Sequence, residues 1–376
     1  MKKRRLVSLL LAVAFAVTLL AGCSGKTAGP GTVTAGQTGK TLDYSKIKIG
    51  EITSLVVNDG GWCQATHQSI LAAMAKLGIP KENLFPIENV AEEQVAVENA
   101  YNALASEGVN LIIGASSGYA TFLSDLAAQN KDIVVAQQGD QKENLIGYQI
   151  RNYEGMFLAG YASALMSDSD TLGFAASMSE ASVRAAINGY ALGAKYAKPG
   201  AKVQVAWANS WYDVDLETQS ARVLIDKGIK YMGMEASSPA IPQTCEARGA
   251  YCIGYNVDMK ALAPKAVLFS YMWNFEPIFT KIITSVADGS ASSDAYYYEG
   301  GECAAISAFN DAIVPKDVQT KVLAVKNDIA AGKIKIYGGE LKDNKGNILV
   351  AAGETMSDEK INTQEFLVEN VLGDWK

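Results

Sequence analysis

The feature that most constrains the fold of this chain is a regular alternation of β-rich runs and helical stretches over most of residues 46–290. The candidate strands are Ile47–Ile52, Val109–Ile113, Ile133–Gln137, Thr171–Ala175, Val203–Trp207, Tyr231–Glu235, Tyr251–Tyr255 and Ala266–Tyr271. The helical patterns between them are Glu92–Ala105, Tyr119–Gln129, Tyr153–Met166, Ser182–Ala197, Leu216–Lys227 and Phe275–Ala287. Strict alternation predicts right-handed crossovers and parallel sheets covered on both faces, so the fold class is α/β.

These units could close into one barrel or divide between two doubly wound sheets. The chain continues to residue 376, with Lys333–Tyr337 and Ile348–Ala351 as further candidate strands, and this length suits about two domains. We therefore expect two lobes with a cleft between them. Ligands of such sheets bind beyond the carboxyl ends of the strands, so the residues that follow each strand are the candidate site.

The N-terminus indicates export. Basic residues Lys2–Arg5 precede the apolar run Leu6–Leu20, and Ala21-Gly22 stand directly before Cys23. This order is typical of a bacterial lipoprotein signal peptide, after whose removal the cysteine is acylated. A membrane-spanning anchor is the alternative, but the run is shorter than the roughly 20 residues that a helix needs to cross a bilayer. We expect an extracytoplasmic protein that is anchored to the bacterial cell membrane through lipidated Cys23.

Composition narrows the function of the remaining chain. Residues from Ser24 to about Tyr44 have the composition of a flexible linker. The chain carries a formal charge of −7, and without the signal segment the balance is more acidic still, which excludes a nucleic-acid partner. The single histidine, His67, excludes the common sites that need two imidazoles, so we expect no metal and no cofactor.

Polar and aromatic residues follow the strands of the first half. Asn58-Asp59-Gly60-Gly61 predicts a turn that leads into a helix beginning near Trp62, whose ring could stack on a planar ligand or cover the core. Ser116 and Gln138 follow two further strands and could bind a heterocycle by hydrogen bonds. The sequence contains neither GxGxxG nor GxxxxGK[ST], so it does not predict a cradle for nucleotide phosphates.

The second half repeats this pattern with residues that follow three of its strands, namely Trp211, Asp213, Asn256, Asp258 and Trp273. Aromatic faces with a few polar groups suit a planar, uncharged, hydroxylated molecule. The same residues could instead pack between the lobes.

An enzyme is the alternative from another functional class. Cys63 and His67 stand four residues apart, so a helix would place them on one face, as a thiolate–imidazole pair requires. Nothing in the sequence orients the histidine, and we expect no catalysis. Cys245 and Cys252 could close a short loop as a disulfide, and free thiols are an equal alternative.

Taken together, the sequence resembles the basic membrane protein family of lipoproteins, which are substrate-binding components of ABC importers similar to purine nucleoside receptors. The segments that carry the resemblance are Asp59–Trp62, Gly147-Tyr148, Arg151–Gly160, Asn188–Tyr190, Gly193, Ser210–Asp213, Asp258-Met259, Gly339–Asn347 and Ala352–Glu354. The resemblance implies a type I periplasmic-binding-protein fold, in which three hinge crossings join two lobes that close on a ligand.

On this basis the chain divides into a signal peptide, an anchored linker and two lobes. The boundaries are 1–22 for the signal peptide, 23–44 for the lipidated cysteine and linker, 45–149 plus about 258–290 for lobe 1, and 150–257 plus about 291–376 for lobe 2. The expected partners are a small molecule, namely a purine nucleoside or nucleobase, and an ABC permease in the membrane.

The ligand is less constrained than the fold. Many nucleoside-binding relatives have Asp near Ser54, Phe where Trp62 falls and Asp near Asn256, so stacking is kept while carboxylates that bind ribose or purine N–H groups are lost. A different small metabolite on the same fold is therefore an alternative. A receptor that signals ligand to a membrane partner is another.

Overall fold

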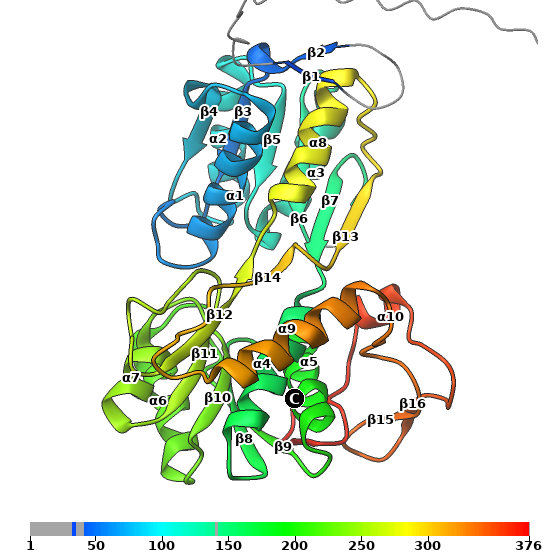
Figure 1. The fold of residues 1–376 in the computed structure, drawn as a ribbon. Coiled ribbons are helices and arrows are strands. Elements are labelled where there is room, and N and C mark those ends of the chain that lie inside the picture. Colours follow the sequence, from blue (N-terminus) through cyan, green and yellow to red (C-terminus); the bar gives the residue numbers. More distant parts are fainter. Residues whose placement is uncertain (1–31, 35–40, 140–141, 376) are drawn as a thin grey trace, which may run out of the picture. The chain divides into compact units, whose positions relative to one another are not determined.

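The computed structural model describes residues 32–34, 41–139 and 142–375, which belong to one compact unit. This unit contains two α/β lobes, each built on its own sheet (Figure 1). The expected signal peptide, Cys23 and most of the expected linker lie outside the described residues. Among the described residues, no helix combines the length and the apolar character needed to span a membrane.

Lobe 1 is a six-stranded parallel sheet in the order β13-β7-β6-β5-β3-β4. Its strands are β3 (Ile49–Ile52), β4 (Leu84–Ile87), β5 (Leu111–Gly114), β6 (Val134–Gln138), β7 (Ile146–Ile150) and β13 (Tyr296–Glu299). Its helices are α1 (Trp62–Leu77), α2 (Gln94–Ser106), α3 (Ala120–Gln129) and α8 (Glu276–Asp288). Short 3₁₀ turns lie at η1 (Tyr44–Lys46), η2 (Lys81–Asn83) and η3 (Ser117–Tyr119).

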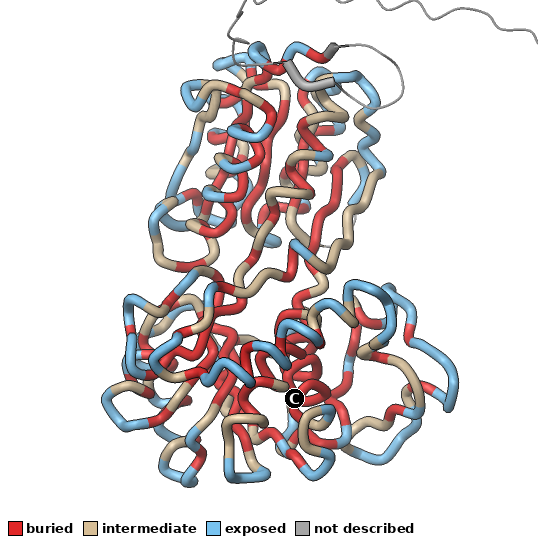
Figure 2. Tube along the Cα trace, viewed as in Figure 1, coloured by how far each residue is buried: buried red, intermediate tan, exposed pale blue. Residues whose placement is uncertain are grey.

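The central strands of lobe 1 are apolar throughout because helices cover both faces of the sheet. Successive side chains of a strand point to opposite faces. Leu111 and Ile113 accordingly pack in the core beneath α1 and α8, whereas Ile112 packs in a second core beneath α2 and α3. Figure 2 shows the buried strands inside a half-exposed helical layer.

Lobe 2 is a seven-stranded sheet in the order β14-β12-β11-β10-β8-β9-β17, in which only β14 is antiparallel to its neighbour. Its strands are β8 (Thr171–Ala176), β9 (Lys202–Trp207), β10 (Tyr231–Glu235), β11 (Tyr251–Gly254), β12 (Val267–Trp273), β14 (Ala304–Ile306) and β17 (Val371–Leu372). Its helices are α4 (Asn152–Met166), α5 (Ala181–Ala197), α6 (Val214–Asp226), α7 (Ala240–Arg248), α9 (Lys316–Ala330) and α10 (Asp358–Asn362). A hairpin of β15 (Leu341–Lys342) and β16 (Ile348–Val350) completes the lobe.

Helices α4 and α5 approach each other closely because glycines stand at their contact. A Cβ added to Gly160 would lie 1.8 Å from the carbonyl oxygen of Tyr190, and one added to Gly193 would lie 1.9 Å from that of Phe157. Any side chain at these positions would force the helices apart.

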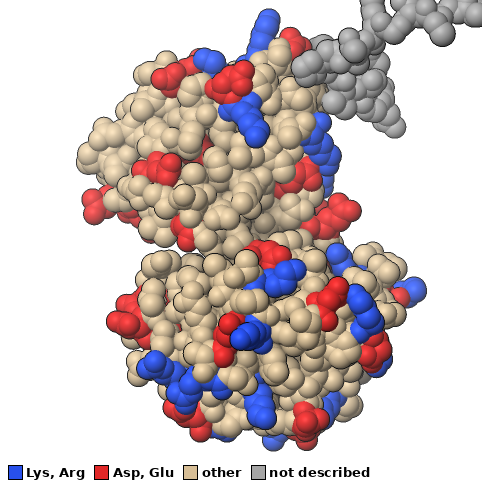
Figure 3. All heavy atoms as spheres, turned by 60° about the vertical axis from the view of Figure 1, so that its left-hand side comes forward, with Lys and Arg blue, Asp and Glu red and all other residues tan. Residues whose placement is uncertain are grey.

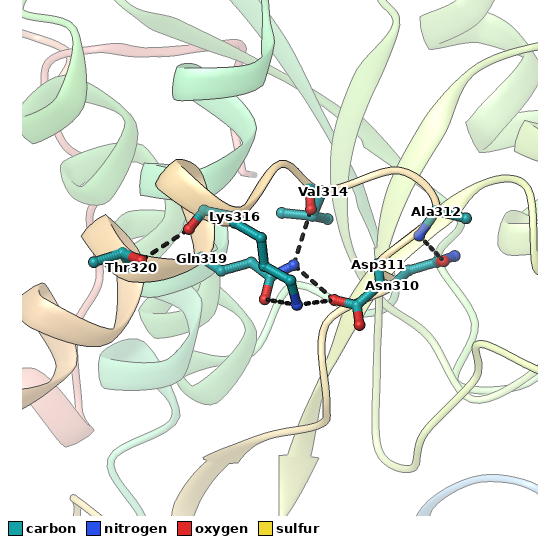
Figure 4. Close-up of polar contacts among 7 residues, drawn as sticks. All are labelled: Asn310, Asp311, Ala312, Val314, Lys316, Gln319 and Thr320. Atoms are coloured by element: carbon teal, nitrogen blue, oxygen red, sulfur yellow. Dashed lines mark hydrogen bonds and ion pairs between the residues drawn. The ribbon is translucent and has the colours of Figure 1, made fainter.

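The segment between β14 and α9 is held by side-chain amides. Asn310 Nδ2 donates to the carbonyl oxygens of Pro264 (2.7 Å) and Val267 (2.9 Å). Gln319 Nε2 donates to the Val314 carbonyl at 2.9 Å and to the Asp311 carboxylate at 2.8 Å (Figure 4). These bonds fix α9 against the body of lobe 2.

Three crossings join the lobes, as the fold predicts, but the second and third lie at other residues than expected. The first follows β7 at Arg151. The second follows β12 near Asn274, not residue 258, because β12 pairs with β11 in the sheet of lobe 2. The third follows β13 at 300–303, because β13 pairs with β7 in lobe 1. An apolar run shows that a strand is buried without showing in which sheet.

Three further expectations need correction or completion. The folded body begins before residue 45, because β1 (Thr32–Thr34) pairs with β2 (Thr41–Asp43) and the buried Tyr44 donates its hydroxyl proton to Thr284 Oγ1 of α8 at 3.3 Å. No strand forms at Lys333–Tyr337, where the chain turns. Cys245 and Cys252 carry free thiols, as do Cys63 and Cys303.

Candidate ligand-binding cleft

A cleft with a volume of about 510 Å³ opens between the lobes at the carboxyl ends of both sheets. Figure 3 shows the groove between the two lobes on one face of the molecule. Seven of the nine predicted ligand residues line this cleft, namely Asp59, Trp62, Ser116 and Gln138 from lobe 1 and Trp211, Asn256 and Trp273 from lobe 2. The volume lies within the range typical of sites for small molecules.

Two tryptophans are in contact at the cleft, Trp62 at the start of α1 in lobe 1 and Trp273 at the end of β12 in lobe 2. The ring centroids of Trp62 and Trp273 lie 5.2 Å apart with an edge-to-face angle of 79°. Trp62 Nε1 donates to the carbonyl oxygen of Ala115, and Trp273 Nε1 donates to Asn256 Oδ1 at 3.0 Å. Because both indole N–H groups are satisfied within the protein, these rings offer a ligand only apolar surface and π faces.

The two tryptophans differ in exposure. Trp273 is buried and stacks on Phe275 with a centroid distance of 5.8 Å. Trp62 is half-buried at the start of α1, so part of its ring faces the cleft. Trp211 stands at the rim with 45% of its surface exposed. Trp62 is therefore the ring that can stack on a ligand inside the cleft.

Asp59 lines the cleft but also holds the start of α1. Its carboxylate accepts the backbone N–H groups of Gly61 (2.8 Å), Gln64 (3.0 Å) and Cys63 (3.2 Å). Gly60 turns the chain with φ +76°, a conformation that glycine adopts without strain. Asp59 thus places Trp62 by fixing the turn that precedes it.

Asp213 and Asp258 lie outside the cleft lining, which corrects two predictions. Asp213 caps α6 by accepting the N–H groups of Asp215 (3.0 Å) and Leu216 (2.9 Å). Asp258 accepts the N–H of Lys260 at 3.0 Å in a tight turn. Aspartate is favoured both as a helix cap and as a ligand-binding group, so its place after a strand did not separate these roles.

Ser116 is engaged within lobe 1. Its hydroxyl donates to the Glu92 carboxylate, and its carbonyl oxygen accepts from Gln137 Nε2. Gln138, at the end of β6, is half-buried in the lining. Lobe 1 thus presents hydroxyl, amide and carboxylate groups beside the ring of Trp62.

Sequence reasoning missed a buried polar group of lobe 2. Ser177 Oγ, Glu235 Oε2, Tyr255 Oη and Asn256 Nδ2 are buried without a well-formed hydrogen bond among the described residues, and all four side chains line the cleft. The Tyr255 hydroxyl nevertheless lies close enough to Glu235 to lower the pKa of that carboxyl group. Only Asn256 of these four was a prediction. Their position in the sequence could have identified them, because each ends or closely follows a predicted strand. Buried polar atoms are nearly always paired, so these four indicate a missing partner.

The buried environment of Glu235 raises the pKa of its carboxyl group. Burial, together with the nearby Glu180 carboxylate, raises the pKa of Glu235 to about 8, although the Tyr255 hydroxyl acts in the opposite direction. The side chain is 4% exposed. At neutral pH it is mostly an uncharged carboxylic acid, with one O–H donor and one carbonyl acceptor.

The cleft lining is acidic. It includes Asp59, Glu92, Glu180 and Glu235, while the described residues that line it include no lysine, arginine or histidine. Phosphate and carboxylate ligands are normally held by such cations. This lining therefore disfavours anionic ligands and suits an uncharged molecule.

The arrangement of Cys63 and His67 does not form a nucleophilic pair. Burial raises the pKa of the Cys63 thiol to about 11, so it is protonated at neutral pH. His67 Nδ1 instead lies 2.6 Å from Glu51 Oε2, and this hydrogen bond raises the pKa of the imidazole. A reactive cysteine needs a lowered pKa. Among the described residues, no three His, Cys, Asp or Glu side chains gather as a metal site.

Two proteins with similar sequences are described as binding proteins. A purine-binding protein of Brucella abortus is 29% identical over 329 residues, which cover 87% of this chain and 93% of the relative. A putative ABC transporter glucose-binding protein of Haloferax volcanii is 27% identical, with 86% and 88% covered.

Comparisons of structure and of family agree on the fold. An ABC transporter solute-binding protein from Conexibacter woesei superposes with a TM-score of 0.64 at 18% identity, over 77% of this chain and 97% of that structure. The family model described as ABC transporter substrate-binding protein PnrA-like matches residues 46–340, which include the sheet of lobe 1 and every strand of the lobe 2 sheet except β17. The chain therefore belongs to the Bmp family of PnrA-like ABC transporter substrate-binding proteins.

Proposed function

We propose that this protein captures a purine nucleoside or nucleobase in the cleft between its lobes and delivers it to an ABC permease, while its lipidated Cys23 keeps it at the outer surface of the cell membrane. It makes and breaks no covalent bond. The observation that carries the ligand class is the cleft itself, in which tryptophan rings stand beside hydrogen-bonding groups and no basic side chain is present among the described lining residues.

The geometry suits a flat, uncharged, nitrogen-rich molecule. A purine ring can stack on Trp62 while its edge reaches the polar groups of lobe 2. A nucleotide would place a phosphate among carboxylates. The purine-binding relative from Brucella supports the same class of ligand.

A sugar is the second candidate, because the Haloferax relative is described as a putative glucose-binding protein and aromatic rings also pack on sugars. Native mass spectrometry of the purified full chain separates the two candidates. Unfolding the protein would release any molecule that it carries, and the mass of that molecule identifies it. We expect a purine or a nucleoside, whereas a hexose would contradict the proposal.

The anchor needs a separate test. Cells that express the full chain are labelled with a fatty-acid analogue, and a Cys23→Ala variant serves as the control. We expect label on the wild-type chain only, together with recovery in the membrane fraction. Equal labelling of both chains would contradict lipidation at Cys23.

A further inference from the structure

The unpartnered polar groups of lobe 2 lie in a row across neighbouring strands. In the sheet β8 pairs with β10 and β10 with β11, and neighbouring strands lie about 4.8 Å apart. Glu235 is opposite Ala176 in the pairing of β10 with β8, and Ser177 is the next residue after Ala176. Tyr255 directly follows the end of β11, which pairs with β10, and its hydroxyl acts on the pKa of Glu235. Each of these three side chains is less than 5% exposed.

No group of the described protein neutralises Glu235. Glu180, at the start of α5, adds negative charge and further opposes ionisation of Glu235. The hydroxyls of Tyr255 and Tyr271 have pKa values raised well above the ordinary value by burial, so they stay uncharged. On α4, Glu154 accepts the N–H of Gly301 at 2.7 Å.

Arg184, the cation on α5 that is nearest in sequence to Glu180, hydrogen-bonds to backbone carbonyls and not to Glu235. Arg184 donates from Nε to the Gln364 carbonyl at 2.8 Å and from Nη1 to the Ser179 carbonyl at 2.7 Å. An isolated buried carboxylate is unfavourable, so Glu235 is mostly protonated at neutral pH and its carboxylic acid group is available to a hydrogen-bonding partner. The cleft brings that partner, because Glu235 lines it.

We propose that Glu235, as an uncharged carboxylic acid, is the specificity-determining residue that binds the edge of a purine at which a hydrogen-bond donor and an acceptor stand side by side. This inference rests on the proposed function. The O–H of the acid donates to the ring nitrogen or exocyclic oxygen of the purine, and the carbonyl oxygen of the acid accepts the adjacent N–H. Both the amino edge of adenine and the lactam edge of hypoxanthine offer such a pair.

The pairing makes affinity depend on pH in a defined direction. The bound form keeps the proton of Glu235, so binding is unaffected while the free protein is protonated and weakens as pH rises through the pKa of about 8. Above that pKa each unit of pH costs about tenfold in affinity, since a proton must be taken up with the ligand.

The test compares Glu235→Gln with Glu235→Leu in the full chain. Glutamine keeps one N–H donor and one carbonyl acceptor and cannot ionise, whereas leucine removes both groups at similar size. Calorimetric titration with adenosine and with inosine is carried out at pH 7 and pH 9. The affinity of the Gln variant changes with pH only through groups other than Glu235, and these include the nucleoside itself. The Gln variant is therefore the reference for the pH dependence of the wild type.

We expect the Gln variant to bind within about threefold of the wild type at pH 7 and the Leu variant at least about tenfold more weakly. Between pH 7 and pH 9 the wild type should lose about tenfold more affinity than the Gln variant. Thermal melting of both variants confirms that they fold. A Glu180→Gln variant removes the neighbouring charge, so its loss of affinity should begin at a lower pH than in the wild type.

Three results would overturn the inference while leaving the proposed function intact. They are a Gln variant that binds as weakly as the Leu variant, a wild type whose affinity falls no more than that of the Gln variant, and a Leu variant that binds like the wild type. A wild-type protein that binds neither nucleoside nor free base would overturn the proposed function, and this inference with it.

Discussion

Trp62 combines a structural contact with a candidate binding surface. Its indole N–H holds the Ala115 carbonyl, while the rest of the ring packs edge-on against Trp273 and Phe275 and faces the cleft. Ligand stacking and the bracing of lobe 1 therefore depend on the same side chain. Substitutions that preserve the ring separate the two roles.

Trp62→Ala should weaken binding of a purine by about 1–3 kcal/mol, the range observed for aromatic side chains that stack on bases. Trp62→Phe is the matched control, since it keeps a stacking face and loses the indole N–H. Calorimetric titration measures both variants. Equal affinity of Trp62→Ala and wild type would rule out stacking on this ring, and an equal loss in both variants would assign the effect to the N–H contact instead.

Glu235 also has a consequence for stability. Its pKa is raised from 4.5 to about 8, so the folded protein binds a proton that the unfolded chain has released, and the free energy of unfolding falls as pH rises through this window. Glu235→Gln cannot ionise. Its stability relative to wild type should therefore rise from pH 5 to pH 8, by about 1.4 kcal/mol per pH unit in the middle of the window.

Urea unfolding of ligand-free wild type and Glu235→Gln over this pH range measures the effect. Glu217→Gln serves as a comparison, because burial also raises the pKa of Glu217, but its carboxylate accepts hydrogen bonds from Ser238 N and Oγ and from Asp213 N. Loss of those bonds makes that substitution destabilising. A difference between wild type and Glu235→Gln that does not change with pH would contradict the raised pKa.

At the scale of single residues, the rule that ligands bind beyond the ends of strands found residues that line the cleft. It did not show which of the residues it selected face a ligand and which hold local backbone. The rule selected Trp62, Asn256 and Trp273 correctly as lining residues, but it also selected Asp213 and Asp258, which cap local backbone. Glu235 ended a predicted strand and was passed over. Its significance depends on having no partner, and partners come from segments distant in the sequence.

At the scale of elements, α4 and α5 depend on close contact between their backbones. Gly193→Ala places a methyl group against the Phe157 carbonyl and should destabilise the protein by about 2 kcal/mol or more. Gly200→Ala is the matched control, because its added Cβ comes no closer than 3.7 Å to another atom, and it should change stability by less than about 0.5 kcal/mol. Urea unfolding measures both. If Gly193→Ala lowers the free energy of unfolding as little as Gly200→Ala is expected to, then α4 and α5 can move apart at little cost.

The secondary-structure pattern was the most predictable part of the molecule. The strand Tyr231–Glu235 was predicted with its observed bounds, and Thr171–Ala175 differs by one residue, because short, mostly apolar runs that are buried in a parallel sheet leave a continuous signal. β7 and β13 were missed. Each mixes tyrosine or glutamine with glycine or glutamate, so the local sequence carries no continuous apolar signal, although β7 is buried and β13 is half-buried.

At the scale of the whole molecule, three crossings join the lobes and set how they can move. Polar contacts cluster at these crossings, where Arg151 pairs with Asp358 at 2.5 Å and Glu154 holds the backbone of Gly301. A ligand that contacts both lobes favours the state in which they approach. The cleft supplies contacts from both sides, with Trp62 and Ser116 from lobe 1 and Glu235 and Asn256 from lobe 2.

The central claim is that this cleft binds an uncharged purine. Calorimetric titration of the ligand-free full chain with adenosine, adenine, inosine and hypoxanthine, and with adenosine 5′-monophosphate as the charged control, tests it most directly. We expect binding of at least one nucleoside or base and affinity for the monophosphate at least about 100-fold weaker, since its phosphate would enter an acidic lining. Folded, ligand-free protein that binds none of the uncharged purines, or that binds the monophosphate as tightly as adenosine, would show that this cleft is not a site for an uncharged purine.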